Sequence, residues 1–269
     1  MQFPSTFSDR KVATNGIELR VVMGTDEQKP PLLMLHGIYH RAESWLPVAE
    51  RLAKSYRLIM PDLRGHYRSD WPETGYELPD YAADAAGLLD SLGIDQAFVL
   101  GHSLGAMIAM VLSGQHPDRV RALVLEDPPS ERSNDTRTWL GALLSAKRAT
   151  AEQTYVAIQG IHPERTEEDW RRETDWLRAT GDGPFLALIE ATGGEPESFE
   201  AAMQRISSRT RMLQADPRQG GALSTEAGRR ATEGRDDRKL VRFPETGHLI
   251  HMERPEKFVK SVEEFLGDA

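Results

Sequence analysis

The stretch that decides the fold is AFVLGHSLGAMIAMVLSG, residues 97–114. Its first part is a short, continuous apolar run of strand length. Its second part has the apolar spacing of a helix that buries one face, at Leu104, Met107, Ile108, Val111 and Leu112. Ser103 lies between Gly101 and Gly105, where one pattern gives way to the other. The stretch therefore predicts a buried strand that turns sharply into a helix, with a serine at the turn.

The sequence of this turn, G-x-S-x-G between a strand and a helix, is typical of a nucleophilic serine. A turn this sharp constrains the backbone of the serine, so the flanking residues must lack a Cβ atom. It also raises the serine oxygen above the carboxyl ends of the strands, where α/β sheets bind ligands. A serine between glycines can also simply cap a helix. The strand before it and the helix after it favour the nucleophile.

Strand-length apolar runs recur on both sides of this stretch and alternate with segments of helical spacing. Such alternation is typical of βαβ units in a parallel sheet. We predict an α/β fold with a mostly parallel, doubly wound sheet of eight strands, opened by an antiparallel hairpin. The clearest strands are expected at residues 17–23, 31–37, 56–62, 96–102, 121–127, 210–216 and 239–245, and helices at 42–53, 79–92, 104–113, 225–232 and 255–266.

Residues 128–208 break the alternation, because they contain helical patterns but no convincing strand. We therefore predict a core made of residues 1–127 and 209–269, with a helical cap inserted at residues 128–208. The charged run HPERTEEDWRRETDWLRATG, residues 162–181, is interpreted as a solvated helix face.

Composition limits the partners. The chain has 269 residues, of which 39% are hydrophobic and 28% charged, a balance typical of a globular protein. Its net charge of −9 and the lack of a basic run argue against nucleic acid or an anionic membrane as partners. Without cysteine, thiol nucleophiles and disulfides are excluded. We find no signal-peptide-like or membrane-spanning apolar segment, so we expect a cytoplasmic protein, a monomer or homodimer.

A serine hydroxyl needs a base that accepts its proton and a third group that orients the base. His248 follows the last predicted strand and precedes the last helix, so its loop opens at the same sheet edge as Ser103. It is the predicted base. His251 is a weaker candidate, because it is expected to pack or cap near the helix that begins at Pro255. The histidines show no metal-ligand spacing, so we expect no metal.

Two backbone amides are predicted to form an oxyanion hole. The N–H of Leu104 follows the serine, and the N–H of Ile38 follows His36 and Gly37 at the end of an earlier strand. Both amides can face the point where a negative oxygen would develop in acyl transfer.

Four motifs now stand in a fixed order: LHG (35–37), MPDLRGHYRSD (60–70), GHSLGA (101–106) and ETGHLIH (245–251). In order and spacing, over nearly its whole length, the chain resembles the α/β-hydrolase fold proteins that carry a helical cap. The resemblance implies hydrolytic chemistry without a cofactor. Tyr67 departs from it, since a glycine is usual at that position, and Ala106 and Tyr39 are milder departures.

The orienting acid has two possible places in this family. In most members it follows the seventh strand, but here Arg218 stands at that position. Asp216, two residues earlier, matches an acid that is usually noncatalytic. In haloalkane dehalogenases and the fungal zearalenone lactonase the acid follows the sixth strand, where this chain has Asp127, 24 residues after Ser103. We predict Asp127, with Asp216 as the alternative.

A smaller possibility is Glu126, whose side chain should point to the opposite face of its strand.

These residues predict a serine hydrolase that cleaves a small or medium acyl or aryl ester through an acyl-enzyme. A serine at the turn argues against dehalogenase and epoxide hydrolase activity, since those members resemble each other in using an aspartate there. The alternatives are a lactonase, a C–C bond hydrolase, a cofactor-free perhydrolase and a noncatalytic ligand receptor. Residues expected to contact the substrate, a small ester or lactone, are Tyr39, His102, Trp139 and Trp170.

Overall fold

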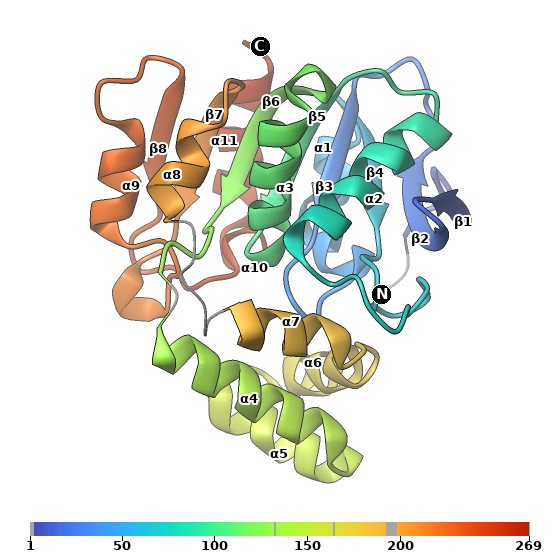
Figure 1. Ribbon diagram of the computed structural model, residues 1–269, viewed down its shortest axis with the longest axis vertical. Coiled ribbons are helices and arrows are strands. Elements are labelled where there is room, and N and C mark those ends of the chain that lie inside the picture. The colour runs from blue at the N-terminus through green and yellow to red at the C-terminus, as the bar shows by residue number, and fades with distance from the viewer. Residues whose placement is uncertain (1–2, 132, 164, 192–197, 269) are drawn as a thin grey trace.

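The computed structural model describes residues 3–131, 133–163, 165–191 and 198–268. At its centre is an eight-stranded sheet of order β1-β2-β4-β3-β5-β6-β7-β8 (Figure 1). β1 pairs antiparallel with β2 and β2 with β4, whereas the strands from β3 to β8 are parallel to their neighbours. The predicted α/β fold, with its opening hairpin, is confirmed. The strands are β1 (Phe7–Thr14), β2 (Ile17–Gly24), β3 (Pro31–Leu35), β4 (Arg57–Pro61), β5 (Ala97–His102), β6 (Val120–Glu126), β7 (Arg209–Gln214) and β8 (Arg238–Arg242).

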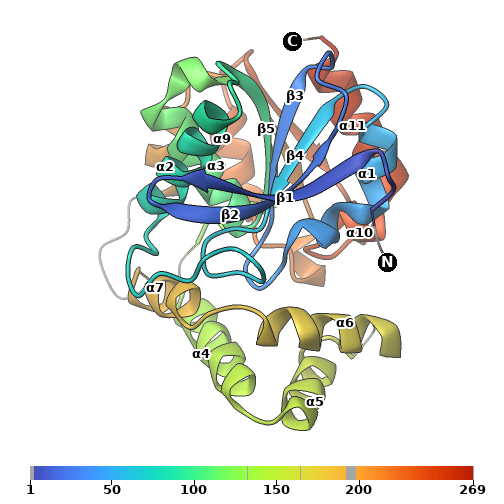
Figure 2. The same cartoon turned by 90° about the vertical axis from the view of Figure 1, so that its right-hand side faces the viewer.

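Helices cover both faces of the sheet, because its parallel strands present apolar side chains on each side. α2 (Leu78–Ser91), α3 (Leu104–Gln115) and α9 (Thr225–Thr232) pack on one face. α1 (Leu46–Leu52), α10 (Ile250–Glu253) and α11 (Pro255–Leu266) pack on the other (Figure 2). Three short 3-10 helices complete the core: η1 (Ala42–Trp45), η2 (Pro117–Arg119) and η3 (Pro217–Gln219).

Four further helices stand off one end of the sheet (Figures 1 and 2), and the β6 arrow points toward them in Figure 1. They are α4 (Asn134–Arg148), α5 (Ala151–Ile161), α6 (Glu167–Arg178) and α7 (Gly183–Ala191). Side-chain caps at Ser133, Thr150 and Thr166 fix where three of them begin. α8 (Phe199–Gln204) instead packs on α3 and α9, beside the sheet. The cap boundaries at 128 and 208 stay a prediction.

The described helices include none that is long and apolar enough to cross a lipid bilayer.

The turn from β5 into α3 is packed without space for side chains on either glycine. A Cβ atom on Gly105 would lie 1.9 Å from the carbonyl oxygen of Leu35, at the end of β3. One on Gly101 would lie 2.2 Å from the carbonyl oxygen of Gly105. Ser103 itself has φ of +52° and ψ of −115°, a conformation that L-residues rarely adopt. Both glycines are therefore required by backbone contacts.

Gly105→Ala should lower the free energy of unfolding by about 3 kcal/mol or more, because backbone atoms of β3 and α3 must separate to admit the methyl group. Gly141→Ala, inside α4, is the matched control. Its new Cβ meets nothing within 4 Å, so stability should rise by about 0.5–1 kcal/mol. Urea unfolding of both variants measures the difference. Equal effects at the two positions would contradict the packing described here.

Candidate active site

Ser103 lies between β5 and α3, at the end of the sheet that faces α4 to α7. Its N–H donates to the carbonyl oxygen of Glu126 at 3.0 Å, which ties the turn to the end of β6. The residue is 8% exposed. No hydrogen bond joins its hydroxyl to His248 within the described parts of the chain.

His248 and Asp127 are in direct contact: Nδ1 of the imidazole lies 2.6 Å from Oδ2 of the carboxylate. Asp127 is fully buried and has φ of +43°. Its carboxylate also accepts hydrogen bonds from the N–H groups of Ala215 at 3.1 Å and Ala222 at 2.7 Å. These donors satisfy the oxygens of the buried carboxylate. The carboxylate can therefore hold a proton on Nδ1 and leave Nε2 available as a base.

Asp216, the alternative acid, has a different partner. Its carboxylate binds the guanidinium of Arg218 at 2.7 and 3.0 Å and accepts the N–H of Glu245 at 3.1 Å. The Arg218 guanidinium holds the pKa of Asp216 well below its usual range. Of the two predicted acids, the structure brings Asp127 to His248, while Asp216 braces the loop after β7.

The predicted oxyanion amides come from neighbouring segments. A Cβ atom on Gly37 would lie 3.3 Å from Cβ of Ser103, so the loop before Ile38 passes directly against the serine. The hydrogen bonds of the described residues include none donated by the N–H of Ile38 or of Leu104. Two unengaged amides thus stand on the segments that flank the serine.

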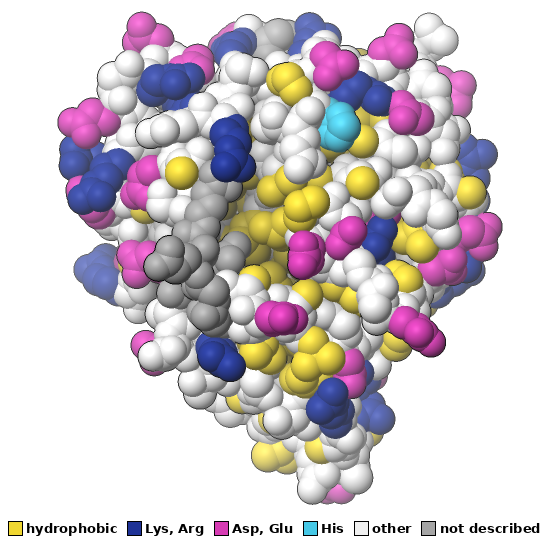
Figure 3. All heavy atoms as spheres, in the orientation of Figure 1, with side chains coloured by type: hydrophobic (Ala, Val, Ile, Leu, Met, Phe, Trp, Pro, Cys, Tyr) yellow, Lys and Arg dark blue, Asp and Glu magenta, His cyan; other side chains and the backbone are white. Residues whose placement is uncertain are grey.

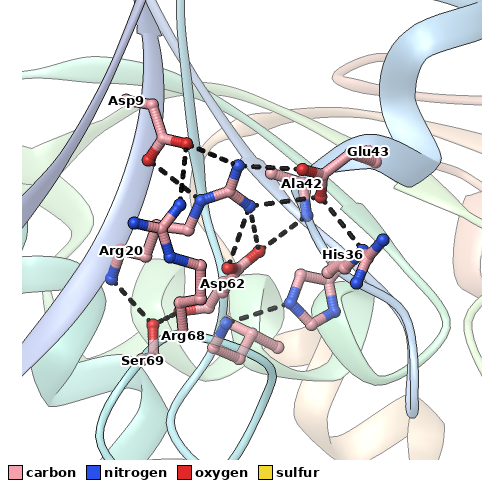
Figure 4. Close-up of polar contacts among 10 residues, drawn as sticks. Asp9, Arg20, His36, Ala42, Glu43, Asp62, Arg68 and Ser69 are labelled. Carbon is pink, nitrogen blue, oxygen red and sulfur yellow. Dashed lines mark hydrogen bonds and ion pairs between the residues drawn. The ribbon is translucent and has the colours of Figure 1, made fainter. Parts of the chain in front are cut away.

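A buried polar network fixes the loop that carries Ile38 (Figure 4). Asp62, after β4, accepts the N–H of Ala42 at 2.9 Å and pairs with Arg20 at 3.1 Å. Burial raises the pKa of Asp62 to about 6, against the effects of Arg20 and the Ala42 amide. His36 accepts the N–H of Leu63 at 3.0 Å. Side chains from β2, the β3 loop and the β4 loop therefore hold one another in place.

Tyr67, which replaces the usual glycine, has φ of +45°. Its N–H donates to the carbonyl oxygen of Ala179 at 2.7 Å, and the neighbouring Gly65 oxygen accepts from Gly181 at 2.7 Å. The Arg41 guanidinium lies 4.0 Å from the tyrosine ring centroid. This loop therefore joins the core to the segment between α6 and α7.

The four residues expected to contact substrate have different surroundings. Tyr39 and His102 are buried, and Nε2 of His102 donates to the carbonyl oxygen of His248 at 3.1 Å. Trp139 is 36% exposed. The indole of Trp170, on α6, donates to the carbonyl oxygen of His162, which follows α5, at 2.7 Å. Contact of these side chains with a substrate stays a prediction.

Two pairs of polar residues were not foreseen. Glu126 and His251, the weaker candidates for acid and base, contact each other at 2.8 Å. On α6, Glu173 is almost fully buried and paired with Arg165. The charged run 162–181 is thus not entirely a solvated face, since α6 turns Glu173 inward and Arg171 outward. Helical spacing was the available signal, because residues 173, 174, 176 and 177 share the buried side of α6.

Apolar side chains gather on the face shown in Figure 3. A cleft of about 160 Å³ opens along α3, the helix that follows Ser103. Its lining includes Leu78, Met107, Met110, Val111, Pro129 and Phe199. Within the described ranges, no cluster of three or more His, Asp or Glu residues could hold a metal ion.

A family model described as the alpha/beta hydrolase fold matches residues 30–166, about half of the chain. The chain belongs to this family. Residues 30–166 include the β3 loop, the serine turn and the end of β6.

One relative is similar over most of its length. It is 2-(acetamidomethylene)succinate hydrolase of Mesorhizobium japonicum, which is 27% identical over 250 residues, or 88% of each chain. The crystal structure of E-2-(acetamidomethylene)succinate hydrolase superposes with a TM-score of 0.82 at 26% identity, over 98% of this chain and 100% of that one.

Two other similarities are narrower. Epoxide hydrolase 2 of Siraitia grosvenorii is 42% identical, but over 42% of this chain and 36% of its own. The enol-lactonase from Burkholderia xenovorans LB400 shares the fold, with a TM-score of 0.80 at 20% identity over 96% of this chain and 100% of that one. The α/β hydrolases similar to this chain therefore include hydrolytic enzymes with different substrates.

Burial lowers the pKa of four histidines near the site: His36, His40, His66 and His102. They stay neutral in the folded protein while the unfolded chain takes up protons below about pH 6.5. Stability should therefore decrease as the pH falls below about 6.5, by about 1.4 kcal/mol per pH unit for each histidine. Asp62 has the opposite effect on stability. Its pKa is raised to about 6 in the folded protein, so below about pH 6 the folded state binds a proton there that the unfolded state does not yet bind. Urea unfolding at pH 7.5, 6.0 and 5.0 measures the slope, and a flat profile would contradict it.

Proposed function

We propose that this α/β hydrolase is a serine hydrolase that cleaves a carboxylic ester of small or medium size through an acyl-enzyme. The observation that carries the proposal is the 2.6 Å contact between His248 and the buried Asp127, at the same sheet edge as the Ser103 turn. A histidine held by an ionised carboxylate is the base that a serine hydroxyl requires.

In the proposed reaction, the Ser103 oxygen attacks the ester carbonyl carbon while Nε2 of His248 takes the hydroxyl proton. The N–H groups of Ile38 and Leu104 donate to the oxyanion of the tetrahedral intermediate. The intermediate collapses as His248 returns the proton to the departing alcohol oxygen, which leaves an acyl-serine. Water, deprotonated by His248, attacks the acyl carbon to give a second tetrahedral intermediate. This intermediate collapses as His248 returns the proton to the Ser103 oxygen, which releases the acid and restores the serine hydroxyl. Contacts between serine and histidine tighten when substrate is bound.

The hydrolase of Mesorhizobium japonicum acts, by its name, on 2-(acetamidomethylene)succinate. Its similarity over 88% of both chains favours a second candidate, cleavage of an acylated amine on a small carboxylate. In that reaction Ser103 would again form the acyl-enzyme, with His248 as the base. Ser103 stands at the turn where we expect an aspartate in epoxide hydrolases, so the partial likeness to epoxide hydrolase 2 does not lead us to propose epoxide opening.

A fluorophosphonate should label Ser103, and p-nitrophenyl acetate or butyrate should be hydrolysed with a burst of p-nitrophenol. Ser103→Ala should abolish labelling and lower kcat by about 10⁴-fold or more. Mass spectrometry of the labelled peptide and stopped-flow absorbance provide the measurements. A panel of esters, lactones and N-acylated small carboxylates then ranks the candidates by kcat/KM. Lack of both labelling and turnover would rule out a serine hydrolase.

Asp127→Asn should lower kcat by about 10⁴-fold, because the amide no longer stabilises the His248 tautomer and imidazolium that catalysis requires. Asp216→Asn should lower kcat less than about tenfold, since its carboxylate contacts Arg218 and the Glu245 amide. Steady-state kinetics on the same ester compare the two, with thermal melts to verify folding. The opposite ranking would identify Asp216 as the orienting acid.

A further inference from the structure

Glu126 joins the three segments of the candidate site. Its carbonyl oxygen accepts the N–H of Ser103 at 3.0 Å. Its carboxylate accepts the N–H of His251 at 2.8 Å and faces Nδ1 of the same histidine at 2.8 and 2.9 Å. The next residue, just after β6, is Asp127, the partner of His248. One residue thus contacts the serine turn through its backbone and the histidine loop through its side chain.

Neither side chain of this pair can reach a substrate, because Glu126 and His251 are both 0% exposed. The ring of His251 lies 4.5 Å from the Trp45 ring and 6.0 Å from the Phe258 ring, between centroids. Its Nε2 has no hydrogen-bond partner among the described residues. Among the residues that the structure describes, the His251 side chain therefore makes polar contacts with Glu126 alone.

The loop from His248 to His251 is held at both ends, by Glu126, the last residue of β6, and by Asp127, which follows it. Asp127 binds the His248 ring and Glu126 binds His251 three residues later. His102 adds a third contact, since its Nε2 donates to the carbonyl oxygen of His248. The two carboxylates therefore hold this loop at two positions that are three residues apart.

We propose that Glu126 and His251 are positioning residues, which hold the histidine loop so that His248 stays aligned with both Asp127 and Ser103. The inference rests on the proposed serine hydrolase for its catalytic consequence, but the contacts of Asp127 with His248 and of Glu126 with His251 are present without substrate. Small displacements of a catalytic base are costly, since an error of 1 Å can lower the rate by about 10²-fold. A pair that served stability alone would leave the rate of each folded molecule unchanged.

The test compares His251→Leu with His251→Asn, two variants of nearly equal size. Asn can place an N–H donor where Nδ1 stood, whereas Leu cannot. His251→Leu should lower kcat, per site titrated with fluorophosphonate, by about tenfold or more with KM within about twofold. His251→Asn should keep kcat within about threefold of the wild type. Glu126→Gln, which keeps the shape but loses the charge, should behave like His251→Leu, and supplies the comparison if that variant does not fold.

Proton NMR provides a readout that needs no substrate. An imidazole N–H in a short bond to a carboxylate resonates far downfield, so the wild type should show one such signal from His248 and one from His251. His248→Asn assigns the first. His251→Leu should remove the second and also shift or broaden the first, whereas His251→Asn should leave the first in place.

Asp84→Asn is the control for loss of a buried ion pair elsewhere. Asp84 on α2 pairs with Arg64, and both side chains are buried. This variant should lower the melting temperature without changing the His248 signal or kcat.

The positioning inference is overturned if His251→Leu and Glu126→Gln leave both the His248 signal and kcat unchanged. It is also overturned if His251→Asn loses as much kcat as His251→Leu. If no substrate is turned over but the His248 signal still moves in His251→Leu, the proposed function fails while the positioning role stands.

Discussion

The close contact between the start of α3 and the end of β3 is the constraint on which the candidate site depends. Gly105 lies so near the Leu35 carbonyl that no side chain fits between them. This approach lets the helix begin directly after the strand and forces Ser103 into its positive φ. Such a conformation persists only where the surrounding structure determines it. The same contact brings the β3 loop, with Gly37 and Ile38, against the serine.

The end of β6 is the second fixed point. Asp127 is a buried carboxylate, which would be costly without compensating donors. Backbone N–H groups after β7 and the imidazole of His248 provide those donors. Glu126 meets the same requirement through His251. Two buried carboxylates thus stand side by side, and each is satisfied by a different segment of the chain.

Hydrophobic patterning was sufficient to predict the sheet, because strands buried on both faces are nearly continuous apolar runs. The G-x-S-x-G motif predicted that Ser103 lies at a turn from a strand into a helix. The place of His248 after the last strand predicted that its loop lies at the same edge of the sheet. The interpretation of residues 162–181 was less accurate. A charged run on a helix has two faces. Helical spacing puts Glu173 on the same side of α6 as Trp176 and Leu177, but only the folded chain shows that this side is covered and that Glu173 pairs with Arg165 near Tyr39.

The sequence by itself determined the alternation of strands and helices, the glycines at the serine turn and the short set of residues from which a base and an acid could come. Only the tertiary structure decided that Asp127 rather than Asp216 meets His248, and that Glu126 meets His251. The hydrogen-bond partners of the Asp127 carboxylate lie 88 to 121 positions further along the chain. Local patterns report local geometry, whereas a contact across that separation is set by how β6, β7 and the last loop come together in the folded sheet.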